Sequence, residues 1–420
     1  MAKKFSGCVS GFRFLYRSSN LNHNFSYLSP VKQPYPGRIR IGLSVLIIIF
    51  SFSLTSKAQE TDSVRHRPSF IMRQINRVFN DTADDNQPSF TYYPSLGYAP
   101  ETGVEMGGSI LKLFRVKKDH ANRLSEIKAT GFFTFKAQYG AMFENAIYGD
   151  KDKWFFLGRT TVQRFPLFYY GIGPDAKPDN YAVVDANYII IRQRVLRKLK
   201  KNFFIGPEVD FQTLWNVNFK QPQQLPHALP AGSDGSTNLG LGLALVYDTR
   251  HNVLNVRKGL FAELSFMRYS PDMGSDYRFN TINADLRSFH RVSKRNVLAW
   301  QVYGTFVDGG APFNQLALMG GDMLMRGYYQ GRFRDKNLIG TQTEFRMLPF
   351  AFHKRFGASI FAGAAVVGPK TGDIQMRNVR YSGGFGIRYL LFPKKDIFLR
   401  LDIGFTQEGS SFYFHSGEAF

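Results

Sequence analysis

The chain has 420 residues, of which 15% are aromatic and 20% charged, and its formal net charge is +22 at pH 7. After residue 54 it contains no run of roughly 18 apolar residues, which excludes a bundle of membrane-spanning helices. The mean hydropathy of -0.24 is slightly polar. Many aromatics without an apolar span are typical of a transmembrane β-barrel.

The first predicted element is a secretory signal peptide over 1–58. An apolar core at 41–54 follows Arg38 and Arg40 and precedes a Ser-Lys-Ala site that ends at Ala58. A basic flank, a short apolar core and a small-x-small site are the features of a cleaved signal. A membrane anchor is the alternative, but the core is short for a span. The long basic stretch before the core leaves the true start codon open.

Removal of this segment would change both the cysteine content and the charge. The only cysteine is Cys8, so the remaining chain would form no disulfide. The segment holds eight Lys or Arg and no acid, so the net charge would fall from +22 to +14. Basic chains often bind nucleic acid, but an exported protein rarely meets it, and the basic residues look spread along the chain rather than clustered. We expect a basic lumen or contact with anionic lipid headgroups, and no nucleic-acid partner.

Residues 59–89 form a polar leader. Apolar residues between Phe70 and Phe79 recur at near-helical spacing, which predicts one short amphipathic helix. We expect a periplasmic lead-in or a partial plug, and a flexible tail is the alternative.

From residue 90 to 420 the apolar pattern repeats every second residue. Within 397–405 the odd positions are apolar, whereas Arg400, Asp402 and Gly404 are polar or small. Successive side chains of a strand point to opposite faces, so one face is apolar and the other polar. The apolar face would pack on a second sheet in a soluble sandwich, and would meet lipid in a transmembrane barrel. The expected signal peptide and the aromatic content favour the barrel.

About sixteen segments follow this pattern, an even number as in antiparallel bacterial barrels. Short connections such as 150–152, 350–355 and 393–396 alternate with long ones such as 163–181 and 308–337. With the N-terminus in the periplasm, the long connections become outer loops. The predicted strands are 91–98, 102–114, 126–138, 140–149, 153–162, 182–196, 201–214, 237–248, 258–269, 277–290, 294–307, 338–349, 356–367, 380–392, 397–407 and 411–420.

The last predicted strand ends on an aromatic residue. If it runs over 411–420, Phe412, Phe414 and Phe420 share one face. The terminal ring would then lie at the membrane interface. We expect this strand to act as a signal that an assembly machine can read.

A specific motif lies in the longest outer connection, 308–337, where Met325-Arg326-Gly327-Tyr328-Tyr329 occurs. With this motif the sequence resembles the BamA/TamA family, the outer-membrane-protein-eighty-five superfamily also called bacterial surface antigens. The resemblance covers about 90–420. Weaker matches are Gly97-Tyr98-Ala99-Pro100-Glu101-Thr102-Gly103, Tyr247-Asp248-Thr249-Arg250, Thr343-Glu344-Phe345, Arg400-Leu401-Asp402-Ile403-Gly404 and Gly417-Glu418-Ala419-Phe420.

The resemblance implies a sixteen-stranded barrel whose long outer loop folds into the lumen. It also implies that the loop arginine, Arg326, binds an acid of the inner wall, and Glu344 aligns with such an acid. A guanidinium is suited to this because its planar fork of donors matches a carboxylate. Gly327 would allow a tight backbone path, and Tyr328 and Tyr329 would pack against the wall.

Two features depart from the family pattern. The family's second wall acid corresponds to Gly363 here, and Asp402 is a candidate lumen acid that could replace it. The stretch 59–89 is also too short for the periplasmic POTRA domains that usually precede such barrels. A separate periplasmic helper protein could supply their role.

The function that the resemblance implies is insertion or translocation of polypeptides at the bacterial outer membrane. Opening of a weakly paired seam between the first and last strands would expose an edge to an incoming strand. The alternative is a passive pore or structural surface barrel without assembly activity. We expect no enzyme, cofactor or metal site, because no catalytic motif occurs and the eight His lack ligand spacing. The expected partners are outer-membrane lipid, an unfolded or secreted polypeptide client and a helper protein.

Overall fold

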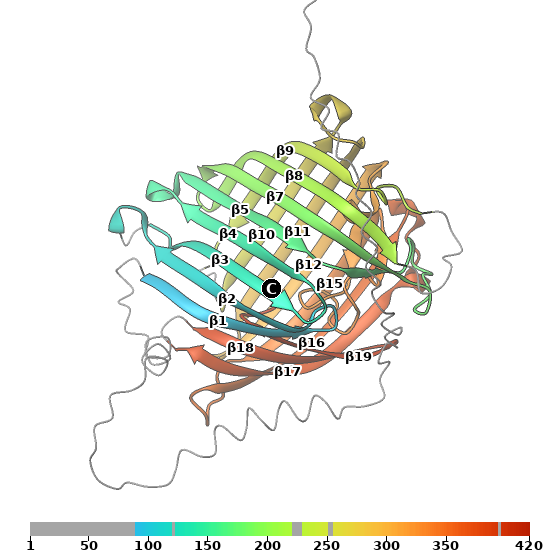
Figure 1. The fold of residues 1–420 in the computed structure, drawn as a ribbon. Coiled ribbons are helices and arrows are strands. Elements are labelled where there is room, and N and C mark those ends of the chain that lie inside the picture. The colour runs from blue at the N-terminus through green and yellow to red at the C-terminus, as the bar shows by residue number, and fades with distance from the viewer. Residues whose placement is uncertain (1–88, 120–121, 221–228, 251–254, 394–395) are drawn as a thin grey trace, which may run out of the picture. The chain divides into compact units, whose positions relative to one another are not determined.

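The computed structural model describes residues 89–119, 122–220, 229–250, 255–393 and 396–420. The predicted signal peptide and the leader up to residue 88 lie outside the described residues. The regular secondary structure of the described chain consists of strands and single turns of 3-10 helix, joined by irregular connections (Figure 1). None of its helices has the length and hydrophobicity needed to cross a membrane.

Seventeen strands form one antiparallel sheet, which closes on itself where the last strand meets the first. β5 and β6 both pair with β7, so the wall has sixteen strand positions, which confirms the predicted barrel. The wall strands are β1 (Ser89–Ala99), β2 (Gly103–Phe114), β3 (Ser125–Thr134), β4 (Tyr139–Tyr148), β5 (Trp154–Arg164), β6 (Leu167–Tyr169), β7 (Ala182–Lys200), β8 (Phe203–Lys220), β9 (Ser236–Asp248), β10 (Gly259–Tyr269), β11 (Phe279–Arg291), β12 (Asn296–Gly309), β15 (Asn337–Met347), β16 (Phe356–Gly368), β17 (Arg380–Phe392), β18 (Ile397–Thr406) and β19 (Gly409–Ser416).

Two further strands lie in the connection between β12 and β15. β13 (Ala317–Met319) and β14 (Phe333–Asp335) pair with each other in a separate two-stranded sheet. The 3-10 turns lie in the connections between strands. They are Val116–Lys118, Asp150–Asp152, Pro271–Met273, Phe313–Gln315, Thr371–Asp373 and Met376–Asn378.

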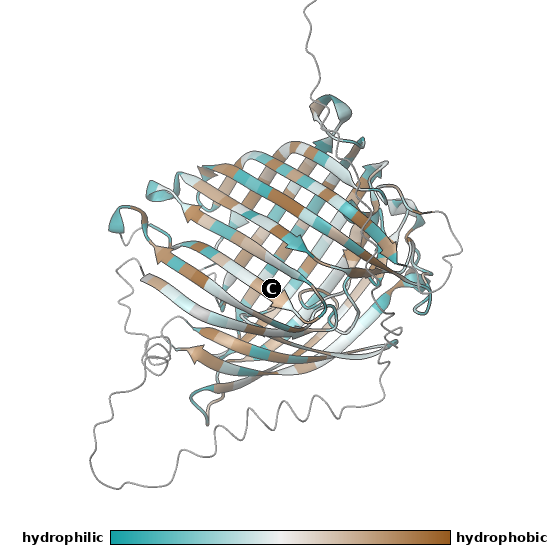
Figure 2. Ribbon diagram, in the orientation of Figure 1, coloured by the Kyte–Doolittle hydropathy of each residue, from teal (hydrophilic) through white to brown (hydrophobic). Residues whose placement is uncertain are grey.

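The period-two pattern places apolar side chains on the outside of the wall. In β9, Leu241 is 45% exposed and Leu243 is 58% exposed, whereas their inward-facing neighbours Ala244 and Val246 are fully buried. Figure 2 shows the same alternation of hydrophobic and hydrophilic residues along the wall strands. The outer face therefore suits lipid, which cannot hydrogen-bond to polar groups.

The connections fall on two edges of the barrel, because consecutive strands are antiparallel. One edge, here called the loop edge, carries the connections 100–102, 135–138, 170–181, 221–235, 270–278, 310–336, 369–379 and 407–408. The other, the turn edge, carries 115–124, 149–153, 201–202, 249–258, 292–295, 348–355 and 393–396. The long connections predicted to be outer loops lie on the loop edge.

The end of the chain differs from the prediction. β19 ends at Ser416 instead of continuing to residue 420, and Gly417 adopts a φ of +85° that breaks the strand. Phe412 and Phe414 lie in β19, but Phe420 does not share their face. Phe420 is only 8% exposed and packs in an inward-facing cluster with Phe289 and residues of β12.

Candidate functional site

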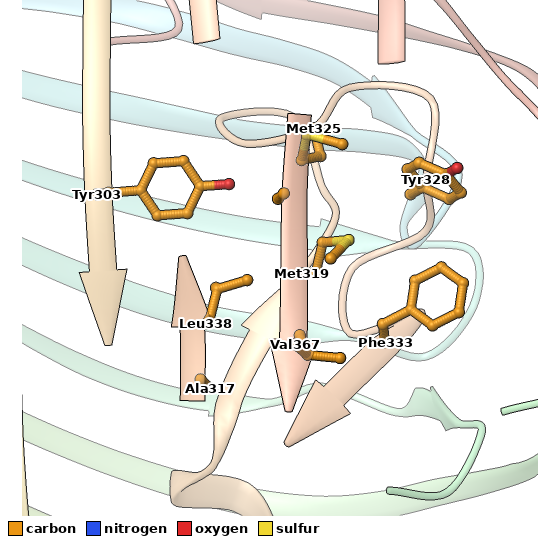
Figure 3. Packing of buried hydrophobic residues seen from close by; sticks show 9 residues of the cluster. Tyr303, Ala317, Met319, Met325, Tyr328, Phe333, Leu338 and Val367 are labelled. Carbon is orange, nitrogen blue, oxygen red and sulfur yellow. The ribbon is translucent and has the colours of Figure 1, made fainter. Parts of the chain in front are cut away.

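A long inner loop, residues 310–336, connects β12 to β15 and folds into the barrel. Its β13–β14 hairpin contributes to an apolar cluster with inward-facing residues of the wall strands (Figure 3). In Figure 3 the rings of Tyr303, Tyr328 and Phe333 surround the side chains of Met319 and Met325. The cluster fixes the loop against the wall by burying apolar surface. Its buried members are Tyr303, Ala317, Met319, Met325, Tyr328, Phe333, Leu338, Ala365 and Val367.

Arg326 lies near the tip of the inner loop and binds two acids of the wall. Its Nη2 donates to Glu344 of β15, and its Nη1 donates to Asp402 of β18 at 2.6 Å. None of the three side chains is exposed to solvent. The guanidinium also lies 3.5 Å from the centre of the Phe361 ring, a cation–π geometry that contributes further attraction. The structure thus brings together the predicted pair and the candidate lumen acid.

Three wall arginines share the same two carboxylates. Glu344 also accepts from Arg346 at 3.1 Å and from Arg388 at 3.0 Å. Asp402 accepts from Arg388 at 2.5 Å and from Arg400 at 3.0 Å. Two carboxylates alone would leave an excess of buried positive charge, which is costly.

Two more acids complete the cluster. Arg388 donates from Nε to Glu418 at 3.0 Å, and Arg400 donates to Asp322 at 2.7 Å. Four arginines therefore face four carboxylates, and the formal charges cancel. We call these eight residues the clamp cluster. Its members are Asp322, Arg326, Glu344, Arg346, Arg388, Arg400, Asp402 and Glu418.

The backbone at Gly327 passes close to β18. Gly327 has a φ of +115°, and a Cβ there would lie 2.5 Å from Cγ2 of Thr406. Its N–H donates to the hydroxyl of Tyr413 at 2.9 Å, and its carbonyl accepts from Ser411 at 3.1 Å. A side chain at Gly404 would likewise meet the loop, because its Cβ would lie 2.5 Å from the carbonyl oxygen of Arg326. The motif therefore needs glycine on both sides of this contact.

The position of Gly363 explains why the wall can lack an acid there. A Cβ at Gly363 would lie 3.2 Å from Sδ of Met325, which precedes Arg326 in the loop. Met325 is fully buried, and the hydroxyl of Ser382 lies 3.8 Å from its sulfur. The methionine thus occupies the space beside Gly363, and Asp402 supplies the second carboxylate from another strand.

The two tyrosines of the motif anchor different parts of the loop. Tyr328 is buried against Phe333, with ring centres 5.7 Å apart. Tyr329 stacks on Phe168 with ring centres 4.9 Å apart. The next residue, Gln330, donates its N–H to Glu101 in the β1–β2 turn at 2.6 Å. The inner loop is therefore attached to the loop edge as well as to the wall.

The electrostatics of Glu101 differ from those of an exposed carboxyl group. Burial raises the pKa of Glu101 from 4.5 to about 7, although the hydrogen bond from Gln330 opposes this shift. Asp322 also raises this pKa, and Lys136 lowers it. Glu101 therefore changes protonation state near neutral pH, at a contact that holds the inner loop.

The seam between β1 and β19 is the weakest junction of the wall. Among the described residues, Tyr98 and Phe414 form the single ladder pair across it, and the rings of Tyr98 and Phe412 stack with their centres 3.8 Å apart. By contrast, eleven residue pairs join β1 to β2, and eight join β18 to β19. In the described chain, β1 is therefore held by a full ladder on its β2 side and by a single ladder pair on its β19 side.

Sequence reasoning missed several residues of the clamp cluster. Alternation already places Arg346, Arg388 and Arg400 on the polar face of their strands, but it does not show which strands meet the loop. Asp322 precedes the motif in the loop, and Glu418 follows the Gly417 break, so neither obeys a strand pattern. In the part of the chain that the structure describes, no group of three His, Cys, Asp or Glu is placed to hold a metal ion.

Comparison with known proteins gives matches at the level of family and fold. The profile of the Omp85 superfamily domain matches residues 131–420. No curated protein sequence matches significantly. Among solved structures, BamA from Haemophilus ducreyi lacking POTRA domains 1–3 has a TM-score of 0.51 and 14% identity, with 79% of this chain and 70% of that chain covered.

Two structures of CdiB are similar to a comparable degree. CdiB from Acinetobacter baumannii has a TM-score of 0.52 at 11% identity, covering 78% of this chain and 59% of that chain. CdiB from Escherichia coli has a TM-score of 0.52 at 10% identity, covering 82% and 69%. These identities are low, so the structural likeness shows a shared barrel fold.

Proposed function

Because the chain belongs to the Omp85 superfamily, we propose that it inserts or translocates polypeptides at the bacterial outer membrane through the seam between β1 and β19. The barrel resides in the outer membrane. We place its turn edge at the periplasm and its loop edge outside, after export by a signal peptide over 1–58. The proposed role is not catalytic, and its partners are the membrane lipid and an unfolded or secreted client.

One observation carries this proposal. The seam is joined by a single residue pair, whereas every other junction of the wall has a longer ladder. A junction with so short a ladder opens more easily than the others, and the strand edge that opening exposes binds an incoming extended segment by adding it to the sheet. The client would thereby gain backbone hydrogen bonds in a medium that supplies none.

A disulfide across the seam tests the proposal. Tyr98 and Phe414 are directly paired, so Tyr98→Cys combined with Phe414→Cys places two thiols within the range of a disulfide. The matched control is Leu96→Cys with Met106→Cys, a directly paired position between β1 and β2. Each purified protein is reconstituted in liposomes and given a urea-unfolded small barrel as client. Insertion is measured by the heat-dependent mobility of the client.

We expect the oxidised seam variant to lose insertion and to recover it after reduction, while the control inserts under both conditions. Full insertion by the oxidised seam variant would contradict the proposal. Planar-bilayer conductance separates the passive-pore alternative. A large and steady conductance without client insertion would favour that alternative and reject the assembly role.

A further inference from the structure

The two edges of the barrel differ sharply in exposed charge. At the turn edge, exposed basic residues occur in or beside six of the seven connections, and the exposed acid among the described residues there is Asp119. The basic residues look spread along the sequence, but the excess of exposed positive charge in the described chain lies at the turn edge. The exposed basic residues of the turn edge are Lys117, Lys118, Lys151, Lys153, Arg197, Lys200, Lys201, Lys258, Arg291, Lys294, Arg295 and Lys354.

The loop edge serves as an internal comparison. Its connections and the strand ends beside them expose acids and bases in equal number among the described residues. The exposed acids are Asp175, Asp179, Asp234, Asp272, Asp276, Asp308 and Asp373, and the exposed bases are Lys136, Lys177, Lys220, Arg268, Arg278, Lys370 and Arg377. The positive charge is therefore a property of one edge and not of the whole molecule.

Aromatic rings on the outer wall accompany this charge. Lys112 lies over the ring of Phe90, with its Nζ 5.1 Å from the ring centre, near the turn-edge ends of β1 and β2. Arg197 lies over the ring of Trp154 at 5.7 Å, where β5 and β7 meet the same edge. Phe90 and Trp154 are 57% and 42% exposed. An aromatic ring with a long basic side chain is the usual pair at the boundary between lipid tails and headgroups.

We infer that the turn edge binds the anionic phosphates of phospholipid headgroups in the leaflet that surrounds it. The basic residues occur in connections all around the circumference, as a planar lipid surface requires. A protein partner that docks on one side would need them in one patch. The inference depends on the membrane location of the barrel and not on client insertion, so the two proposals can fail separately.

Lipid selectivity tests the inference directly. Trace spin-labelled phosphatidylglycerol or phosphatidylcholine is added to phosphatidylcholine bilayers that contain the protein, and electron paramagnetic resonance gives the fraction of each lipid in contact with the barrel. One Lys or Arg near an anionic surface favours binding by about fivefold. We therefore expect an association constant about fivefold higher for phosphatidylglycerol, falling toward equality at high salt.

Two variants with the same change in net charge locate the effect. The turn-edge variant replaces Lys118, Lys201, Lys294 and Lys354 with Gln. The loop-edge control replaces four exposed bases of the other edge, Lys177, Arg268, Lys370 and Arg377, with Gln. We expect the ratio of the association constants of phosphatidylglycerol and phosphatidylcholine to fall at least twofold in the turn-edge variant and to stay unchanged in the loop-edge control.

Three outcomes would overturn the inference. Equal association of the two lipids with the unaltered protein would show that the turn edge does not prefer anionic lipid. It would favour an acidic protein as the partner of this edge. An equal loss in both variants would show that only net charge matters. A loss caused by inorganic phosphate, beyond that caused by sodium chloride of the same ionic strength, would indicate discrete phosphate sites instead of a lipid surface.

Discussion

Removing the charge of Arg326 tests whether buried ion pairs hold the inner loop. Arg326 has two carboxylate partners, Glu344 and Asp402, and none of the three side chains is exposed. Two unit charges 4 Å apart attract by about 4 kcal/mol at an effective dielectric constant of about 20. Desolvation offsets much of this attraction in the intact cluster. Arg326→Met leaves the cluster one cation short, so we expect it to lower the free energy of unfolding by about 3–5 kcal/mol.

A double-mutant cycle assigns the effect to a specific pair. Glu344 also accepts from Arg346 and Arg388, so Glu344→Gln should destabilise the barrel at least as much as Arg326→Met. Each single variant already removes the attraction between Arg326 and Glu344, so the double variant does not lose it a second time. The loss of unfolding free energy in the double variant should therefore be smaller than the sum of the two single losses by about 1–3 kcal/mol.

The measurement is urea unfolding of the purified protein in detergent micelles, followed by the mobility difference between folded and heat-denatured barrels. Arg159→Met is the matched control, because Arg159 pairs with Glu144 through a side chain that is 61% exposed. An exposed pair should contribute less than about 1 kcal/mol. Strictly additive losses, or a loss for Arg326→Met no larger than that of the control, would refute the reasoning.

Three further predictions concern the attachment of the inner loop. Burial raises the pKa of Glu101 to about 7, so ionisation of this carboxyl group destabilises the fold progressively from pH 4.5 to 7. At pH 8, urea titrations should therefore show Glu101→Gln to be more stable than the original protein, by at most about 3 kcal/mol. At pH 4.5 the same titrations should show little difference. Gly327→Ala should lower the free energy of unfolding by about 1–3 kcal/mol, because Gly327 has a φ of +115°. Gly310→Ala is the control, since a Cβ at Gly310 would meet open space, and it should change the free energy of unfolding by less than about 0.5 kcal/mol. Equal losses in the two variants would contradict this prediction. Tyr413→Phe leaves the N–H of Gly327 without its acceptor and should lower the free energy of unfolding by about 1–3 kcal/mol. An unchanged melting temperature would show that this hydrogen bond does not stabilise the fold.

The wall could be predicted from sequence because its pattern is local. The predicted segment 380–392 coincides with β17, and 397–407 differs from β18 by one residue at its end. Each wall strand alternates between lipid and interior, and this alternation needs no knowledge of distant residues. The three-residue segments β6, β13 and β14 were not predicted, because three residues are too few to show a period.

The predicted end of the last strand was wrong for a different reason. Alternation continues weakly through Ser416 and Glu418, but the left-handed conformation of Gly417 redirects the chain into the barrel. Glu418 thereby joins the clamp cluster, and Phe420 contacts it, because Arg346 donates to the main-chain oxygen of Phe420 at 2.9 Å. Such a contact depends on strands distant in the sequence. The motif around Arg326 could be found in the sequence, together with Glu344 and Asp402. The remaining members of the clamp cluster could be identified only from the three-dimensional structure.

The clamp cluster makes rigidity uneven around the circumference. Its charges join β15, β17, β18 and the segment after β19 to the inner loop, so outward bending of this arc would have to separate several buried ions at once. Among the described residues, β1 and the strands that follow it contribute no member of the cluster, and the inner loop is attached to this arc by the hydrogen bond from Gln330 to Glu101 in the β1–β2 turn. Motion at the junction should therefore be one-sided, with β1 swinging away while the carboxy-terminal strands remain a fixed frame. Hydrogen exchange would reveal this as faster amide exchange in β1 than in β18.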